Sequence, residues 1–264
     1  MERCLADYIF DCVSTRLHVL QHGFMKNRSS TTQLLKVYNT IGSVLDAGGQ
    51  VDVIFLDFSK AFDSVSHACL LYKLQYVFGF DERLLKWFES YLSSRLQCVM
   101  IEGECSDWKP VTSGVPQGSI LGPLMFLMFI NDMPDVIVSS TVALFADDCK
   151  VFKVINHERD CVLLQNDLNK LYDWSEKWEM KFNASKCKIM RITRSNSPVE
   201  YNYYLDGTQL ECVGNFKDLG VLFDATLSFK AHIHSVVTKA NRLTGIIKRS
   251  IGFNAPSSVK LTLF

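Results

Sequence analysis

Two strongly apolar segments, with the composition of buried β-strands, each run directly into aspartate. Val-Ile-Phe-Leu leads into Asp57, and Leu-Phe-Ala leads into Asp147 and Asp148, after which the apolar pattern resumes. A carboxylate at the end of a buried strand is costly unless it is paired or binds a cation. If the two strands are neighbours in one sheet, their carboxylates form an all-oxygen site suited to Mg²⁺.

That arrangement suits in-line nucleotidyl transfer. One divalent ion lowers the pKa of the attacking hydroxyl, and a second stabilises the leaving pyrophosphate. The same residues also permit a purely structural interpretation, with Asp147 and Asp148 in a hairpin turn and Asp57 as a helix cap. The spacing alone does not separate these interpretations.

The composition is that of a folded globular chain. Of 264 residues, 48% are hydrophobic and 21% are charged, which argues against disorder. The 28 Lys and Arg equal the 28 Asp and Glu, so a nucleic-acid partner would have to meet a local basic patch. Residues 229–251 contain basic residues and no acid, although a basic helix face is also ordinary solvated surface.

Cysteine usage and hydropathy indicate an intracellular protein without a membrane partner. The nine cysteines form no Cys-x-x-Cys pair, which is typical of reduced thiols. No apolar run reaches the roughly 18 residues of a membrane span. We see no targeting signal, so the nucleus and the cytoplasm both remain open.

Periodicity and turn signals predict mixed helices and strands. Helices are expected over residues 1–22, 31–45, 67–78, 120–130 and 228–248, with further helices capped by Asp81 and by Asn156 and a last one starting at 261–264. Strands are expected over residues 51–57, 141–154, 187–193 and 221–223, with hairpins over 97–111 and between 203–205 and 209–212.

Five short boxes, in this order, resemble the motifs of reverse transcriptases from non-LTR (LINE-type) retrotransposons of the chicken-repeat and jockey kind. They are residues 55–67 (motif A), 113–132 (motif B), 145–148 (motif C), 174–188 (motif D) and 217–221. Residues 23–29 resemble a fingers box, and residues 232–241 resemble the start of a thumb.

The resemblance implies an α+β fold, the right-hand polymerase palm, in which helices back an antiparallel sheet. Residues 1–50 would be partial fingers, 51–225 the palm with motifs A to E and an inserted helical region, and 226–264 the start of a thumb, together one reverse transcriptase domain. The implied function is RNA-directed DNA polymerisation with two Mg²⁺ ions, or Mn²⁺, on an RNA template with a DNA primer and deoxynucleoside triphosphates.

The resemblance also implies roles for individual residues of the palm. Asp57 and Asp147 would be metal ligands, and Asp148 the adjoining metal-site carboxylate nearer the primer end. Lys186 would donate a proton to the leaving pyrophosphate, with Lys181 and Lys188 as competitors for that role. Phe62 would exclude a 2′-hydroxyl by steric clash, the alternative being an ordinary core phenylalanine.

Other matched positions would contact nucleotide or nucleic acid. Gln117 and Gly118 would approach the incoming nucleotide, and Arg28 would hold phosphates. Asp63 and His67 are interpreted as helix-entry and packing residues. Four basic residues would neutralise duplex phosphates: Lys239, Arg242, Lys248 and Arg249.

Two residues depart from the family pattern, and the chain covers only part of the family's domain. Met25 replaces an expected arginine, and Cys149 replaces an expected threonine. We interpret the chain as a domain truncated at both ends, so the isolated chain is expected to be weakly active or inactive. The alternative is an inactive remnant or domesticated fold that binds nucleic acid or protein without catalysis.

Overall fold

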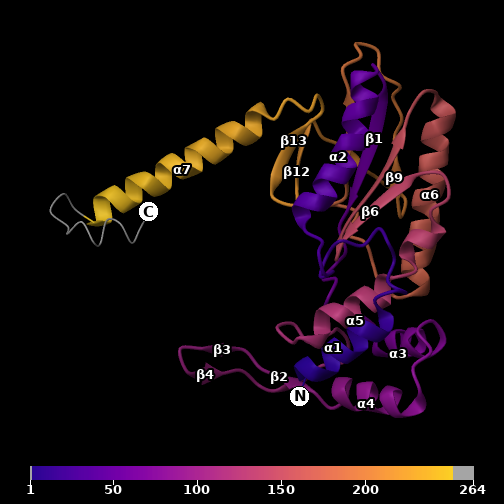
Figure 1. The fold of residues 1–264 in the computed structure, drawn as a ribbon, viewed down its shortest axis with the longest axis vertical. Helices are drawn as coiled ribbons and strands as arrows, with labels where there is room; N and C mark the ends of the chain where they lie inside the picture. Colours follow the sequence, from indigo (N-terminus) through magenta and orange to yellow (C-terminus); the bar gives the residue numbers. More distant parts are fainter. Residues whose placement is uncertain (1, 252–264) are drawn as a thin grey trace. The chain divides into compact units, whose positions relative to one another are not determined.

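The computed structural model describes residues 2–251, and the chain divides into two compact units, Met1–Val213 and Gly214–Phe264 (Figure 1). The larger unit is built on a five-stranded sheet in the order β11–β8–β1–β7–β6. Its strands are β1 (Gln50–Leu56), β6 (Thr141–Phe145), β7 (Asp148–Val154), β8 (Lys188–Thr193) and β11 (Glu211–Cys212). All neighbours are antiparallel except β11 and β8, which confirms the predicted α+β architecture.

Helices cover both faces of this sheet, and its central strand β1 is therefore buried along its whole length. Helix α2 (Ser30–Asp46) contacts β1, β6 and β8. On the other face, alternate residues such as Ile54 and Val151 join one hydrophobic core with α5 (Leu121–Ile130) and α6 (Glu158–Lys177). Every residue of α5 except Pro123 is buried, as its uniformly apolar sequence predicts.

Three further helices lie around α5: α1 (Glu2–Val13), α3 (His67–Tyr76) and α4 (Glu82–Leu92). Asp81 caps α4 as predicted, because its side chain accepts a hydrogen bond from the Leu84 amide. The predicted hairpin forms as two short ladders, β2 (Leu96–Gln97) with β5 (Lys109–Pro110) and β3 (Met100–Ile101) with β4 (Glu104–Cys105). Glu102 and Gly103 at its turn both have positive φ.

Three predicted boundaries are wrong. The helix predicted over 1–22 ends at Val13, because the chain turns and Gln21 forms a parallel bridge to Leu144 at the edge of the sheet. The N-cap of α6 is His157 rather than Asn156. The Asp160 carboxylate accepts hydrogen bonds from the backbone amides of Asn156 and His157.

The third wrong boundary concerns the hairpin predicted to end at Cys212. Strands β9 (Tyr204–Leu205) and β10 (Thr208–Gln209) pair across the Asp206–Gly207 turn as expected. Residues 211–212 then leave the hairpin and pair with β8 as the edge strand of the main sheet. Because this pairing joins segments that are distant in sequence, local turn signals do not reveal it.

Up to residue 251, the smaller unit contains a two-stranded ladder followed by a long helix. Strands β12 (Asn215–Asp218) and β13 (Val221–Asp224) are antiparallel, and α7 (Lys230–Ile251) follows. No residue of α7 is buried. The predicted division into fingers, palm and thumb stays a prediction, and the helix predicted at 261–264 lies outside the described residues. Among residues 2–251, no helix is long and apolar enough to cross a membrane.

A buried lysine joins three helical segments of the larger unit. The Nζ of Lys73 lies 2.6 Å from the carbonyl oxygen of Phe129 and 2.6 Å from Asp132 Oδ1. The Trp174 indole donates to the same Asp132 oxygen, and the ring of Trp178 lies 3.8 Å from the ammonium. The two tryptophans of motif D therefore stabilise this ion pair.

This lysine should make stability depend on pH in a defined direction. Burial lowers the pKa of Lys73 from 10.5 to about 8, although Asp132 opposes the shift. Between those values the unfolded chain binds more protons, so the unfolding free energy of the larger unit should rise with pH. We expect wild type to gain up to about 3 kcal/mol relative to Lys73→Met between pH 7 and 10.

Urea unfolding followed by tryptophan fluorescence measures this difference, because all four tryptophans belong to the larger unit. Other titrating groups are common to both proteins and cancel in the comparison. Parallel pH profiles for the two proteins would show that Lys73 keeps an ordinary pKa.

Candidate functional site

The three predicted acids lie at one end of the main sheet. The last pair between β1 and β7 joins Leu56 and Cys149, so the next residues along these strands are Asp57 and Asp148. Strands β6 and β7 are joined by a two-residue turn, Ala146 and Asp147, because Phe145 pairs with Asp148. Sheet pairing therefore brings together acids that are some ninety residues apart in sequence.

Asp57 is held by the motif D segment. Its carbonyl oxygen accepts from the Asn183 amide at 2.7 Å, and its own amide donates to Cys187 Sγ at 3.4 Å. The side-chain oxygen Oδ2 is buried and accepts no hydrogen bond from the described residues. Its neighbouring cation is Lys186, whose Nζ lies 3.5 Å away on an exposed side chain.

The competing lysine Lys188 is engaged elsewhere. Its Nζ lies 2.8 Å from Glu211 Oε2 and donates to the Ser185 carbonyl oxygen. Of the two, Lys186 is therefore the lysine next to Asp57. Lys181 is exposed, and its carbonyl oxygen accepts from the Ser59 amide.

Asp57 and Asp147 interact electrostatically. Partial burial raises the pKa of Asp147, and the negative charge of Asp57 raises it further. Asp147, whose pKa is raised by burial and by the charge of Asp57, and an Asp57 oxygen that accepts no hydrogen bond from the described residues form a donor pair suited to a divalent cation. Mg²⁺ is commonly held by one or two carboxylates together with substrate phosphates, so these residues fit that ion.

The role of Asp148 as a third metal-site carboxylate stays a prediction. Within residues 2–251, no group of three or more His, Cys, Asp or Glu side chains is arranged to hold a metal ion. Asp148 is the exposed first residue of β7, whereas Asp147 belongs to the turn. The described site is thus the pair Asp57 and Asp147, with Asp148 beside it in sequence.

Phe62 combines the two interpretations that the sequence left open. Its ring stacks on Phe126 with centroids 4.3 Å apart and meets Phe24 edge-on at 6.2 Å. The side chain packs against the core but is only partly buried. A ring supported from behind and partly open to solvent has the rigidity that a steric wall requires.

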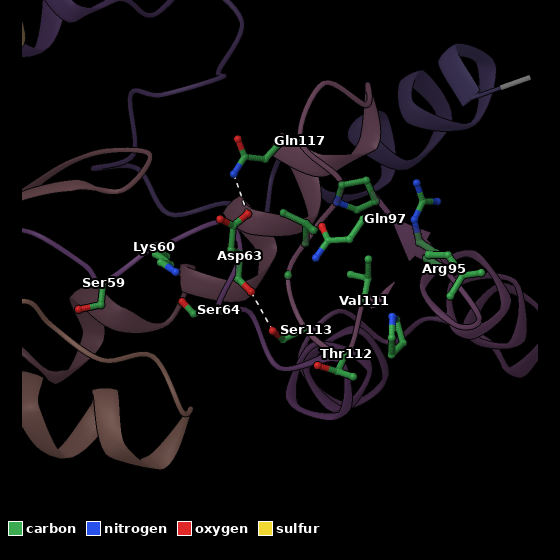
Figure 2. Close-up of a pocket in the computed structure, with 15 residues that line it drawn as sticks. Ser59, Lys60, Asp63, Ser64, Arg95, Gln97, Val111, Thr112, Ser113 and Gln117 are labelled. Carbon is green, nitrogen blue, oxygen red and sulfur yellow. Dashed lines mark hydrogen bonds between the residues drawn. The ribbon is translucent and has the colours of Figure 1, made fainter. Parts of the chain in front are cut away.

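Hydrogen bonds connect the loop of motif B to the turn of motif A (Figure 2). Gln117 Nε2 donates to Asp63 Oδ1 at 2.7 Å, and Ser113 Oγ donates to the Asp63 carbonyl oxygen. His67 Nε2 lies 2.8 Å from the carbonyl oxygen of Gly114. Asp63 and His67 therefore hold the loop that carries Gln117, a more specific task than general packing.

A cavity of about 830 Å³ opens between these two segments and the base of the β2–β5 ladder (Figure 2). Its polar lining includes Lys60, Arg95 and Gln97 in addition to Gln117. Gly118, next to Gln117, has φ +81°, a conformation that favours glycine.

Arg28 bonds to the backbone beside β6, and its predicted contact with phosphates stays a prediction. Its Nη1 donates to the backbone carbonyl oxygens of Val19 and Gln21. The guanidinium thus fixes residues 19–21, the segment beside β6. The four basic residues Lys239, Arg242, Lys248 and Arg249 are exposed on α7 in the smaller unit.

One residue near the site, Gln21, has no role predicted from the sequence, whereas Gly23 belongs to the segment that resembles a fingers box. Gln21 Oε1 accepts from the amide of Ala146, immediately before Asp147, and Gly23 lies against the same turn. The signal available was the Gln-His-Gly sequence before Phe24. Apolar spacing over 1–22 predicts continuous α-structure, so Gln21 and His22 are expected at the end of a helix and Gly23 in the loop that follows.

Curated relatives include two mobile-element polymerases from Drosophila melanogaster. The chain is 29% identical over 265 aligned residues to the "RNA-directed DNA polymerase from mobile element jockey", covering 94% of this chain and 28% of that protein. It is 32% identical to the "probable RNA-directed DNA polymerase from transposon X-element", covering 83% and 24%. The chain thus spans about a quarter of the length of these relatives.

Among solved structures, apo telomerase from Candida tropicalis, truncated from its C-terminal domain, is similar with a TM-score of 0.56 at 12% identity. The similarity covers 87% of this chain and 44% of that chain, and it supports the right-hand polymerase fold. Residues 1–222 match the family described as "Reverse transcriptase (RNA-dependent DNA polymerase)". This match extends over most of the chain and includes the acidic pair, Asp57 and Asp147. The chain therefore belongs to the reverse transcriptase family.

Proposed function

We propose that this chain carries the catalytic palm of an RNA-directed DNA polymerase that adds deoxynucleotides to a primer 3′-hydroxyl on an RNA template. The observation that carries the proposal is the acidic pair: the partly desolvated Asp147 faces the charge of Asp57, whose Oδ2 is buried without a hydrogen bond. Such a pair is costly to fold unless a cation offsets its charge; the exposed Lys186 ammonium, 3.5 Å from Asp57 Oδ2, offsets part of it, and a divalent ion would offset more.

Asp57 and Asp147 would hold Mg²⁺, with Mn²⁺ as a substitute. The ions would supply charge for the attacking oxygen and for the leaving pyrophosphate. Lys186, exposed and 3.5 Å from Asp57 Oδ2, would donate a proton to the leaving pyrophosphate. Gln117, held by Asp63, would orient the nucleotide, and Phe62 would form the wall beneath its sugar.

A primer-extension assay tests this function directly. The chain is incubated with a primed RNA template, deoxynucleoside triphosphates and either Mg²⁺ or Mn²⁺. Extension that depends on the divalent ion supports the proposal, and binding of the primed template without any extension favours the alternative. That alternative, a non-catalytic nucleic-acid-binding fold, draws support from the lack of a three-residue metal group among residues 2–251.

Replacement of Phe62 by valine should relax sugar selectivity. Removing the ring opens the space that a 2′-hydroxyl would occupy, so ribonucleotide incorporation should rise by about tenfold or more relative to deoxynucleotide incorporation. Paired single-nucleotide incorporation assays measure the ratio. Phe80→Val is the matched control, because Phe80 is also partly buried and stacks on a core ring. An unchanged ratio in Phe62→Val would assign Phe62 to packing alone.

The exposed basic face of α7 should contribute to nucleic-acid affinity. Arg242 and Arg249 are two helical turns apart and lie on one face of this acid-free helix. Replacing both with alanine should weaken binding of a primer–template duplex about equally for all sequences. The salt slope should fall by roughly one unit for each lost phosphate contact.

Fluorescence anisotropy over a range of salt concentrations gives this slope. The control replaces Arg83 and Arg159, two exposed arginines of the larger unit, with alanine. If the α7 variant and the control have the same slope, the basic face of α7 does not contact the duplex.

A further inference from the structure

The turn that carries Asp147 is supported by the segment just before Phe24. Gln21, with only 3% of its surface exposed, accepts at Oε1 from the Gly23 amide at 2.7 Å and from the Ala146 amide at 2.9 Å. The His22 amide donates to the Leu144 carbonyl oxygen, which extends the support along β6. A single side-chain oxygen therefore connects this segment to the residue before Asp147.

The supported turn has an unfavourable backbone conformation. Ala146 has φ +54°, in the left-handed region that L-residues other than glycine rarely adopt. Such conformations persist where the surroundings over-determine them, and they concentrate at functional sites. The hydrogen bond from Ala146 to Gln21 is one such constraint.

Gln21 also bears an energetic cost of its own. Its Nε2 is buried and has no hydrogen-bond partner among the described residues, a loss that typically destabilises a fold. An apolar side chain of similar size would avoid that cost but would leave the Gly23 and Ala146 amides without their acceptor. The retained amide indicates that the acceptor Oε1 serves the turn.

Steric contact adds to this support. A Cβ placed on Gly23 would lie 2.4 Å from the Ala146 nitrogen, so only glycine lets the segment approach the turn so closely. Arg28 holds the other side by donating to the carbonyl oxygens of Val19 and Gln21. The segment is thus fixed at both ends.

We propose that Gln21 is a positioning residue of the metal site: it holds the Ala146–Asp147 turn so that the Asp147 carboxylate faces Asp57. The metal-binding part of this inference rests on the proposed function, whereas the fixing of the turn does not. Gln21 acts only through the backbone and is not itself a ligand.

The test compares Gln21→Met with Gln33→Met in the full chain. Gln33 is the matched control, because it is fully buried on α2 and neither of its side-chain polar atoms has a partner among the described residues. Hydrogen exchange read by mass spectrometry over residues 143–149 reports on the turn. Mn²⁺ titration followed by electron paramagnetic resonance gives the metal affinity, which general destabilisation would not change while the chain stays folded.

Gln21→Met should accelerate exchange of the Ala146 amide by about tenfold or more, because its acceptor is lost. The Mn²⁺ dissociation constant should rise by about tenfold, as is typical when a group that orients a ligand is removed. Gln33→Met should change neither quantity. If Gln21→Met does not fold, Gln21→Asn, one methylene shorter, makes the same comparison.

Unchanged exchange at Ala146 overturns the inference. Faster exchange with unchanged Mn²⁺ affinity also overturns it, since the turn would then move without consequence for the site. If wild type itself binds no Mn²⁺, the proposed metal chemistry fails, while the exchange comparison still decides whether Gln21 holds the turn.

Discussion

Asp147→Asn should reduce primer extension on the order of a thousandfold or more, because an amide of the same size cannot supply the negative charge that holds a divalent cation. The fold should persist. Burial and the charge of Asp57 both raise the pKa of Asp147, so removing that charge relieves an unfavourable interaction. Single-turnover extension at saturating nucleotide and metal concentrations, together with thermal unfolding, separates the chemical effect from stability.

Asp206→Asn is the matched control for this substitution. Asp206 also lies in a two-residue hairpin turn, and Asn-Gly forms such a turn as well as Asp-Gly does. Its extension rate should equal that of wild type. An Asp147→Asn variant that keeps a tenth or more of wild-type activity would remove this carboxylate from the catalytic centre.

Gly114→Ala should destabilise the larger unit by about 3 kcal/mol or more, with loss of nucleotide binding. Gly114 has φ +89°, and an added Cβ would lie 2.8 Å from both Cα and the carbonyl oxygen of Asp63. Backbone cannot yield as a flexible side chain can, so the motif B loop must move away from motif A. That movement would break the bond between Asp63 and Gln117.

Gly118→Ala isolates the steric part of this effect. Gly118 also has a positive φ, +81°, but no atom lies within 4 Å of its added Cβ. It should therefore cost only about 1 kcal/mol of backbone strain. Tryptophan fluorescence during urea unfolding measures both variants. Equal destabilisation of the two would show that contact with Asp63 is not what requires glycine at position 114.

Local patterns predicted much of the fold because they reflect local physics. The apolar run before Asp57, the buried α5 and the Asp206–Gly207 turn each follow from short-range composition. The acids at the strand ends were likewise correctly placed at one end of a sheet. Long-range pairings were not predictable, such as β11 on β8 and Gln21 on Leu144, since no local signal records a distant partner.

The site shows the same division. The sequence predicted Asp57 and Asp147 as neighbours. The charge of Asp57 raises the pKa of Asp147, so the two carboxylates do lie close enough to interact. Asp148 begins β7 directly after this turn, and its part in a metal site stays a prediction. The bonds of Arg28 to two backbone carbonyl oxygens were not predicted. Sequence motifs identify residue types, whereas the hydrogen bonds that engage them depend on the folded neighbours.

The two acids are held by segments far apart in the sequence, and this has a consequence for folding. The acidic pair depends on Gln21, which precedes both acids in the sequence, and on Asn183, which follows both. Closing loops of this length carries a large entropic cost, which is recovered only when the whole sheet has formed. We therefore expect no subfragment of residues 21–183 to retain half a site, and metal affinity should appear in one step with the cooperative folding of the larger unit.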